Sequence, residues 1–163
     1  MFKLLSRISL VILKILRLIS FGHMPQITSV CAIIQNERHE FLLQYRADGK
    51  GYCLPGGLTK VGEPVSAGVI REVKEETGIQ IKEVKFLFYI DVSKTFPFSF
   101  TLVFQGEPIG LTTQNSWEGK AEWKRFETVR GSMAFGHEQL IIKFLDSLQI
   151  SSGRVVESFL KTK

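Results

Sequence analysis

The N-terminal stretch of the chain is apolar and is interrupted only by single charges. Residues 1–22 are built mainly of Leu, Ile, Val and Phe, and their charged residues are Lys3, Arg7, Lys14 and Arg17. At 100° per residue these four side chains fall within an arc of about 80°, and apolar side chains cover most of the remaining circumference. The pattern predicts a basic amphipathic helix as a separate N-terminal segment over residues 1–24.

Three uses of this segment remain open. Its longest run without a charge is residues 8–13, well short of the roughly 20 apolar residues that span a bilayer. A helix of this kind suits peripheral contact with a membrane surface through residues 1–22. It is equally suited to packing, either on its own domain or against a second copy in a homodimer, and the third use is a targeting segment.

From residue 25 to residue 150 the pattern is that of one mixed α/β domain. Alternating and β-branched apolar positions predict five strands, at residues 27–35, 40–46, 83–92, 98–106 and 121–126. The first two are separated by a short polar turn and predict a hairpin. Two helices are expected, at residues 66–77 and at about 135–148, which implies helices packed on a mixed sheet.

Two glycine-containing segments and the polar C-terminal end of the chain are expected to lie outside the helices and strands. Residues 47–51 contain two glycines, and residues 54–57 contain a proline and two glycines. Both segments are expected to be loops. Residues 151–163 are mostly polar and are expected to form a C-terminal tail.

Charge and cysteine content narrow the functional classes. The net charge is +5, but four of the 21 basic residues lie in the first 36 residues, which contain no acid. The 17 basic residues left nearly balance the 16 acidic ones, so we expect no stable nucleic-acid partner. The only cysteines are Cys31 and Cys53. Two cysteines are too few for a disulfide scaffold, and a reduced, cytoplasmic setting is expected.

The helix predicted over residues 66–77 carries a cluster of like charges that destabilises it. Glu72, Glu75 and Glu76 lie at i, i+3 and i+4, so three carboxylates repel one another on one side of the helix. The ordinary interpretation of such a cluster is a solvated acidic face. A divalent cation would remove the repulsion, because Mg²⁺ prefers oxygen ligands and shares its remaining positions with water and substrate phosphates. Arg71 can orient these carboxylates, and Glu63 adds a fourth carboxylate where the preceding Gly-rich loop meets the helix.

This stretch resembles the Nudix box, Gly-x5-Glu-x7-Arg-Glu-(apolar)-x-Glu-Glu-x-Gly-(apolar), at every defining position. The matching residues are Gly57, Glu63, Arg71, Glu72, Val73, Glu75, Glu76, Gly78 and Ile79. The segment Leu54-Pro55-Gly56 also looks like the usual lead-in to the box. The resemblance implies the Nudix fold over residues 25–150, an α/β/α sandwich around a mixed sheet.

The resemblance also implies a metal site. Glu72, Glu75 and Glu76 would ligate Mg²⁺ or Mn²⁺, together with the Gly56 carbonyl and Glu63. Arg71 would hold the glutamates in register.

The implied reaction is hydrolysis of a diphosphate linked to a nucleoside or to another group. The box does not identify the general base, because members of the family differ in this respect. Glu72 is preferred, and Glu118 and Glu122 in the downstream loop are the alternatives.

The substrate depends on residues outside the box. Residues 93–99 faintly resemble the signature of NADH pyrophosphatases, and Phe96 and Phe98 are candidates to stack on a base. Packing at a strand edge is the other interpretation of these two rings. We therefore expect a nucleotide-type substrate similar to ADP-ribose or NADH. The alternatives are a (d)NTP pyrophosphohydrolase and a non-catalytic module that senses nucleotides.

Two further residues have structural interpretations. Cys53 lies just before the box with no histidine near it in the sequence, so it is expected to fill space rather than to act as a nucleophile. His137 is expected to begin the last helix as a helix-end or core histidine.

Overall fold

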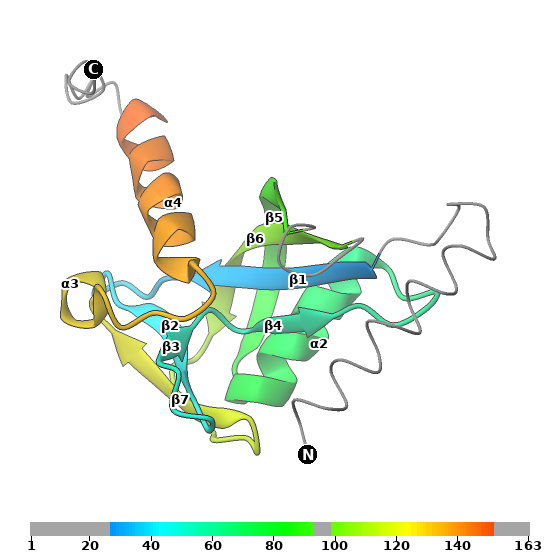
Figure 1. The fold of residues 1–163 in the computed structure, drawn as a ribbon, viewed down its shortest axis with the longest axis horizontal. Coiled ribbons are helices and arrows are strands. Elements are labelled where there is room, and N and C mark those ends of the chain that lie inside the picture. The colour runs from blue at the N-terminus through cyan, green and yellow to red at the C-terminus, as the bar shows by residue number, and fades with distance from the viewer. Residues whose placement is uncertain (1–26, 93–98, 152–163) are drawn as a thin grey trace.

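A computed structural model describes residues 27–92 and 99–151 of the chain (Figure 1). The N-terminal segment 1–24 lies outside the described residues, and so do the membrane and homodimer contacts expected of it. Phe96, Phe98 and all of the tail except Ser151 also lie outside the described residues. Within the described part, no helix is both long enough and apolar enough to cross a bilayer.

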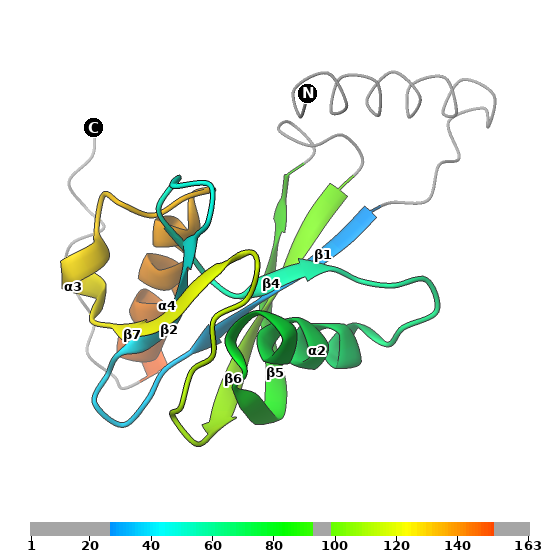
Figure 2. The same cartoon turned by 90° about the horizontal axis from the view of Figure 1, so that it is seen from below.

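The described strands form two sheets. A four-stranded sheet has the order β4-β1-β6-β5, and a three-stranded sheet has the order β3-β2-β7. Figure 2 shows the smaller sheet beside the larger one. The strands are β1 (Ile27–Ile34), β2 (Phe41–Arg46), β3 (Tyr52–Cys53), β4 (Gly56–Leu58), β5 (Gln80–Asp91), β6 (Ser99–Ile109) and β7 (Gly119–Lys124). The helices are α2 (Val65–Thr77), α3 (Phe126–Val129) and α4 (His137–Ser151).

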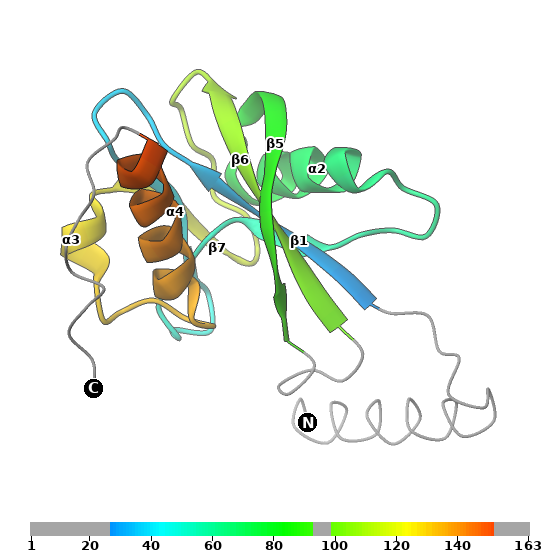
Figure 3. The same cartoon turned by 90° about the horizontal axis from the view of Figure 1, so that it is seen from above.

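The central strand β1 connects the two halves of the core. It pairs in parallel with β6 and antiparallel with β4, so the larger sheet is mixed. Val30, Ala32 and Ile34 face α2, where they pack with Val69 and Val73. The intervening side chains of β1 pack on the opposite side with residues of α3 and α4. Helices therefore cover both faces of the sheet (Figure 3), and the expected α/β/α sandwich around a mixed sheet is confirmed.

The predicted hairpin of the first two strands is wrong. A single bridge between Gln35 and Phe41 and a hydrogen bond from the Asn36 amide to the Glu40 carbonyl close the turn. Beyond the turn, β1 belongs to the larger sheet and β2 to the smaller one. The strands separate because β1 is buried on both faces and its two edges are already paired with β4 and β6.

Other predicted elements exist with shifted ends. The helix predicted at 66–77 begins one residue earlier, as α2, and the three other predicted strands exist as β5, β6 and β7. The last helix begins at His137 rather than near residue 135, because Phe135 and Gly136 both have positive φ angles, 57° and 71°. The short elements β3, β4 and α3 were not predicted. Of the two segments interpreted as loops, residues 54–57 contribute the first two residues of β4, and β3 lies between the two segments.

Candidate active site

The glutamate-bearing helix α2 has clear sequence limits. Pro64 precedes its first turn with φ −57°, and its fixed ring suits the start of a helix. Gly78 ends it in the left-handed region at φ 73°, where its amide donates to the Lys74 carbonyl. Val69 and Val73 bury one side of α2 against the sheet. The acidic side is therefore directed toward β4 and the loop that precedes the helix.

Arg71 contacts three of the four carboxylates of the box. Its Nε and Nη2 atoms donate to the two oxygens of Glu63, at 2.8 and 2.9 Å. Its Nη1 atom donates to Glu72 at 2.7 Å and to Glu75 at 3.1 Å. The hydrogen bonds from Arg71 lower the pKa of Glu63 to about 2. One guanidinium thus offsets much of the repulsion among these acids and fixes their positions.

Glu76 is the buried acid of the cluster. Its side chain lies in the protein interior with 6% of its surface exposed, and it accepts a hydrogen bond from the Gly56 amide at 2.8 Å. Burial raises the pKa of Glu76 to about 8, and the neighbouring carboxylates of Glu118 and Glu72 add to the increase. A negative charge at this position is therefore undercompensated by the protein.

The acids do not form a ready-made metal cage. Over residues 27–92 and 99–151, no set of three His, Cys, Asp or Glu side chains converges closely enough to hold an ion. The reason is visible in the hydrogen bonds of Arg71, which engage Glu63, Glu72 and Glu75. Such a site suits an ion that takes part of its coordination shell from water and substrate.

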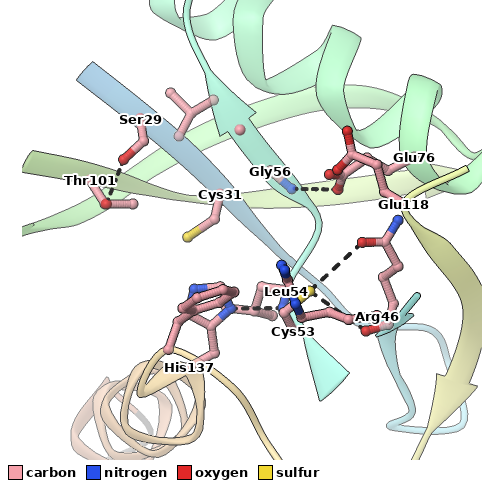
Figure 4. A pocket seen from close by; sticks show the side chains of 14 residues that line it. Ser29, Cys31, Arg46, Cys53, Leu54, Gly56, Glu76, Thr101, Glu118 and His137 are labelled. Atoms are coloured by element: carbon pink, nitrogen blue, oxygen red, sulfur yellow. Dashed lines mark hydrogen bonds between the residues drawn. The ribbon is translucent and has the colours of Figure 1, made fainter. Parts of the chain in front are cut away.

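A cavity of about 180 Å³ adjoins these acids. Figure 4 shows Glu76 and Glu118 together at one end of it and His137 at another part of the wall. Gly56 of β4 and Cys31 of β1 line the space between them. The cavity therefore has an acidic end on the box and a second end built by other elements.

The second end of the cavity combines a cation with an aromatic ring. The guanidinium carbon of Arg46 lies 4.6 Å from the centre of the Phe135 ring, and both residues line the cavity. Asp48 holds Arg46 through two hydrogen bonds of 2.8 and 2.6 Å. The Phe135 ring is 63% exposed, so its edge remains accessible to a ligand.

His137 joins α4 to the lead-in of the box. Its Nδ1 atom accepts the Leu54 amide at 2.9 Å, which requires a neutral ring with that nitrogen unprotonated. Desolvation, together with the nearby charge of Arg46, lowers the pKa of His137 to about 4. The histidine is thus a neutral structural acceptor at the start of a helix, as the sequence analysis expected.

The two cysteines are buried free thiols. Burial raises the pKa of both Cys31 and Cys53 to about 12, so neither carries the thiolate that a nucleophile needs. The Cys53 thiol donates to the Gln44 carbonyl. This geometry fits the space-filling role expected of Cys53.

The two downstream candidates for general base are in different positions. Glu118 lines the cavity. Glu122 instead accepts contacts from Lys120 at 2.6 Å, Lys124 at 3.2 Å and the Tyr52 hydroxyl at 3.1 Å, and those bonds lower its pKa. Both acids are candidates from the sequence pattern, whereas no pattern in the sequence predicts a role for Arg46 or Phe135. The only local signal for Arg46 was its place at the end of a strand before an Asp-Gly turn.

Solved structures with this fold define the class of protein. The NUDIX domain of Shewanella oneidensis NrtR superimposes with a TM-score of 0.68 at 20% identity, over 78% of this chain and 91% of that one. MutT protein from Methanosarcina mazei superimposes with a TM-score of 0.61 at 28% identity, over 78% and 97% of the two chains. The fold is therefore the Nudix fold.

Sequence comparison gives the family. Residues 25–147 match the NUDIX domain family. A MutT-like protein of Streptomyces ambofaciens is 36% identical over 121 residues, which are 74% of this chain and 75% of the relative. The NAD-capped RNA hydrolase NudC of Vibrio vulnificus is 31% identical over 84 residues, half of this chain but only 31% of NudC. The chain belongs to the Nudix family and is a Nudix hydrolase, an enzyme acting on pyrophosphate bonds.

Proposed function

We propose that this hydrolase is metal-dependent and cleaves the diphosphate linkage of a nucleoside diphosphate derivative similar to ADP-ribose or NADH. The observation that carries the proposal is the buried carboxylate of Glu76 with the exposed carboxylate of Glu118 beside it, at one end of a cavity whose other end presents Arg46 beside Phe135. The acidic end suits a cation with phosphates, and the other end suits a planar group.

The residues at the acidic end fit Mg²⁺ or Mn²⁺. All the available donors are oxygens, which these cations prefer, and the raised pKa of Glu76 marks negative charge that the protein alone leaves undercompensated. We assign the ligands to Glu72, Glu75, Glu76 and the Gly56 carbonyl. A bound ion would neutralise charge on the phosphate oxygens and on the leaving group. Glu63 would act through Arg71, since both its oxygens contact that guanidinium.

The protein side chains would handle the proton and the geometry. Glu72 is our preferred general base, taking a proton from the attacking water. Glu118 is the alternative because it lines the cavity, whereas the contacts of Glu122 with two lysines make it the weakest candidate. Arg71 would keep the glutamates in the positions required for attack.

The substrate class rests on the wall made by Arg46 and Phe135. A guanidinium and an aromatic ring can both stack on a nucleobase or a nicotinamide. Relatives support this choice: the NrtR domain was solved with ADP ribose, and a bifunctional NMN adenylyltransferase/ADP ribose pyrophosphatase from Francisella tularensis was solved with AMP and a Mn ion. Phe96 and Phe98 remain candidates for the same role.

A substrate panel tests this function. The protein is incubated with ADP-ribose, NADH, nucleotide sugars, diadenosine polyphosphates and (d)NTPs, each with Mg²⁺ or Mn²⁺, and phosphate products are measured. We expect cleavage of ADP-ribose or NADH to be fastest. Preferential cleavage of (d)NTPs would establish the alternative substrate class. Binding without cleavage of any compound would establish a nucleotide sensor.

Glutamine variants test the metal assignment. Glu75→Gln and Glu76→Gln should each lower turnover by about a hundredfold or more, because each removes a charged ligand. Glu83→Gln, on the exposed face of β5, is the matched control and should retain activity. Full activity in both Glu75→Gln and Glu76→Gln would overturn the ligand assignment.

A further inference from the structure

An apolar surface on the larger sheet is covered at one end and open at the other. Two rows of side chains run across β1, β6 and β5, since Val30 is in register with Leu102 and Tyr89, and Ala32 with Phe104 and Phe86. At the β1 end, Val30 and Ala32 are 1% and 0% exposed. At the β5 end, Tyr89 is 64% exposed and Phe86 is 50% exposed. We call the open end, formed by Phe86, Tyr89 and Leu102, the β5 surface.

Helix α2 lies on the same face but does not reach this surface. Its buried residues Val69 and Val73 pack with the β1 side of both rows. The ends of β1, β5 and β6 nearest Asp91 project beyond α2 in two views (Figures 2 and 3). Because β5 is also the edge of its sheet, the β5 surface combines an open edge with exposed aromatic rings. Proteins normally cover such an edge.

We propose that the N-terminal segment of the same chain, residues 1–22, docks its apolar face on the β5 surface. The described chain begins at Ile27, at the end of the sheet where Thr28 lies in register with Phe100, and Phe100 with Asp91. From β1 to β5 is two strand spacings, about 10 Å. Residues 23–26 can span up to about 14 Å when extended, so the segment can reach Tyr89.

The chemistry of the two surfaces is complementary. As the amphipathic helix that their sequence predicts, residues 1–22 would present a broad face of Leu, Ile, Val and Phe, with all four of their charges on one basic stripe. If the apolar face covers Tyr89 and Phe86, the basic stripe remains in water. A tethered segment also has an effective concentration in the millimolar range for a short linker, which favours it over a second copy at ordinary protein concentrations.

Engineered cysteines in the full chain test the docking. At 100° per residue Ile12 lies opposite the basic stripe and Ser6 lies beside it. The test variant combines Ile12→Cys with Tyr89→Cys, and its matched control combines Ser6→Cys with Tyr89→Cys. The native thiols Cys31 and Cys53 are buried and stay in place. A second test variant pairs Ile12→Cys with Phe86→Cys, and circular dichroism confirms that all variants are folded.

After mild oxidation we expect disulfides within single chains, at a yield about fivefold or more above the Ser6 control, since exchange depends on access between the thiols. Equal yields in test and control variants would overturn the proposal, as would no disulfide in either test variant. Disulfides between chains would identify a second copy as the occupant. Flotation with phosphatidylserine vesicles, without intrachain disulfides in solution, would identify a membrane surface instead.

Discussion

The carboxylate of Glu72 occupies the space that a side chain at position 57 would need. A Cβ atom built on Gly57 would lie 2.7 Å from one oxygen of Glu72 and 2.9 Å from the other. Gly57 does not have a positive φ angle, so the box needs glycine here for the close approach of Glu72 rather than for an unusual backbone. Gly57 and Glu72, the first and fourth defining residues of the box, thus form one steric unit.

The substitution Gly57→Ala should therefore impair catalysis more than folding. The added methyl group must push aside the end of the Glu72 side chain, and a shift of about 1 Å in a catalytic group costs up to about a hundredfold in rate. Steady-state kinetics should show the loss in kcat, while the melting temperature changes little because a flexible side chain can move.

A double variant separates this steric effect from others. If Gly57→Ala acts through Glu72, adding it to Glu72→Gln should cause no further loss of kcat. If the reductions in kcat caused by the two single substitutions instead multiply in the double variant, Gly57 acts on another part of the site.

Sequence patterns predicted the helix that carries the acids, but not the residues at the other end of the cavity. Helix α2 was predicted to within one residue, because apolar spacing and a terminal glycine are local signals. Arg46 and Phe135 are 89 positions apart in the chain and meet only through tertiary packing. Periodicity cannot reveal such a contact.

The short strands were missed for a related physical reason. Strands β3 and β4 have two and three residues, and β4 begins with two glycines. These residues are extended because β1 and β2 pair with them, not because of their own β-propensity. The hairpin prediction was wrong because the turn residues specify where the chain reverses, not which sheet each strand joins.

Metal binding should become tighter as pH rises toward 8. The pKa of Glu76 in the metal-free protein is raised to about 8, and a carboxylate must lose its proton to act as a ligand. Below that pKa the Mg²⁺ affinity should increase by about tenfold per pH unit, and above it the affinity should level off. Calorimetric titration with Mg²⁺ at several pH values measures this slope, and a flat profile would contradict the assignment.

Two variants test whether Glu118 is the neighbour that helps to raise the pKa of Glu76. Glu118→Gln removes a negative charge that raises the pKa of Glu76, so the pH at which affinity levels off should fall. Glu122→Gln is the control, because that carboxylate is engaged by Lys120 and Lys124. An equal effect of both substitutions would indicate general electrostatics rather than the contact with Glu118.

His137 should make the fold sensitive to acid. Its folded-state pKa, about 4, lies below the ordinary value of 6.5, so between these values the unfolded chain binds the extra proton. The free energy of unfolding contributed by His137 should therefore fall as pH decreases from 6.5 to 4, by at most about 3 kcal/mol. Urea denaturation at pH 7, 6, 5 and 4 measures the loss.

A variant is needed to isolate this contribution. The raised pKa of Glu76 acts in the opposite direction, since it makes stability fall as pH rises from about 4.5 to 8. The difference between the native protein and His137→Gln cancels the Glu76 contribution and should decrease toward acid. A difference that stays constant with pH would contradict the neutral-acceptor role of His137.

Arg46 should contribute to substrate affinity through its planar shape rather than its charge. Arg46→Lys keeps the positive charge but removes the flat guanidinium that lies over Phe135. With ADP-ribose as substrate, KM should rise by about tenfold, the equivalent of one good stacking contact, while kcat changes little. Phe135→Ala should produce the same split, and Phe135→Tyr, which keeps a ring, should restore KM. A loss confined to kcat in both Arg46→Lys and Phe135→Ala would move these residues from substrate binding to the chemical step.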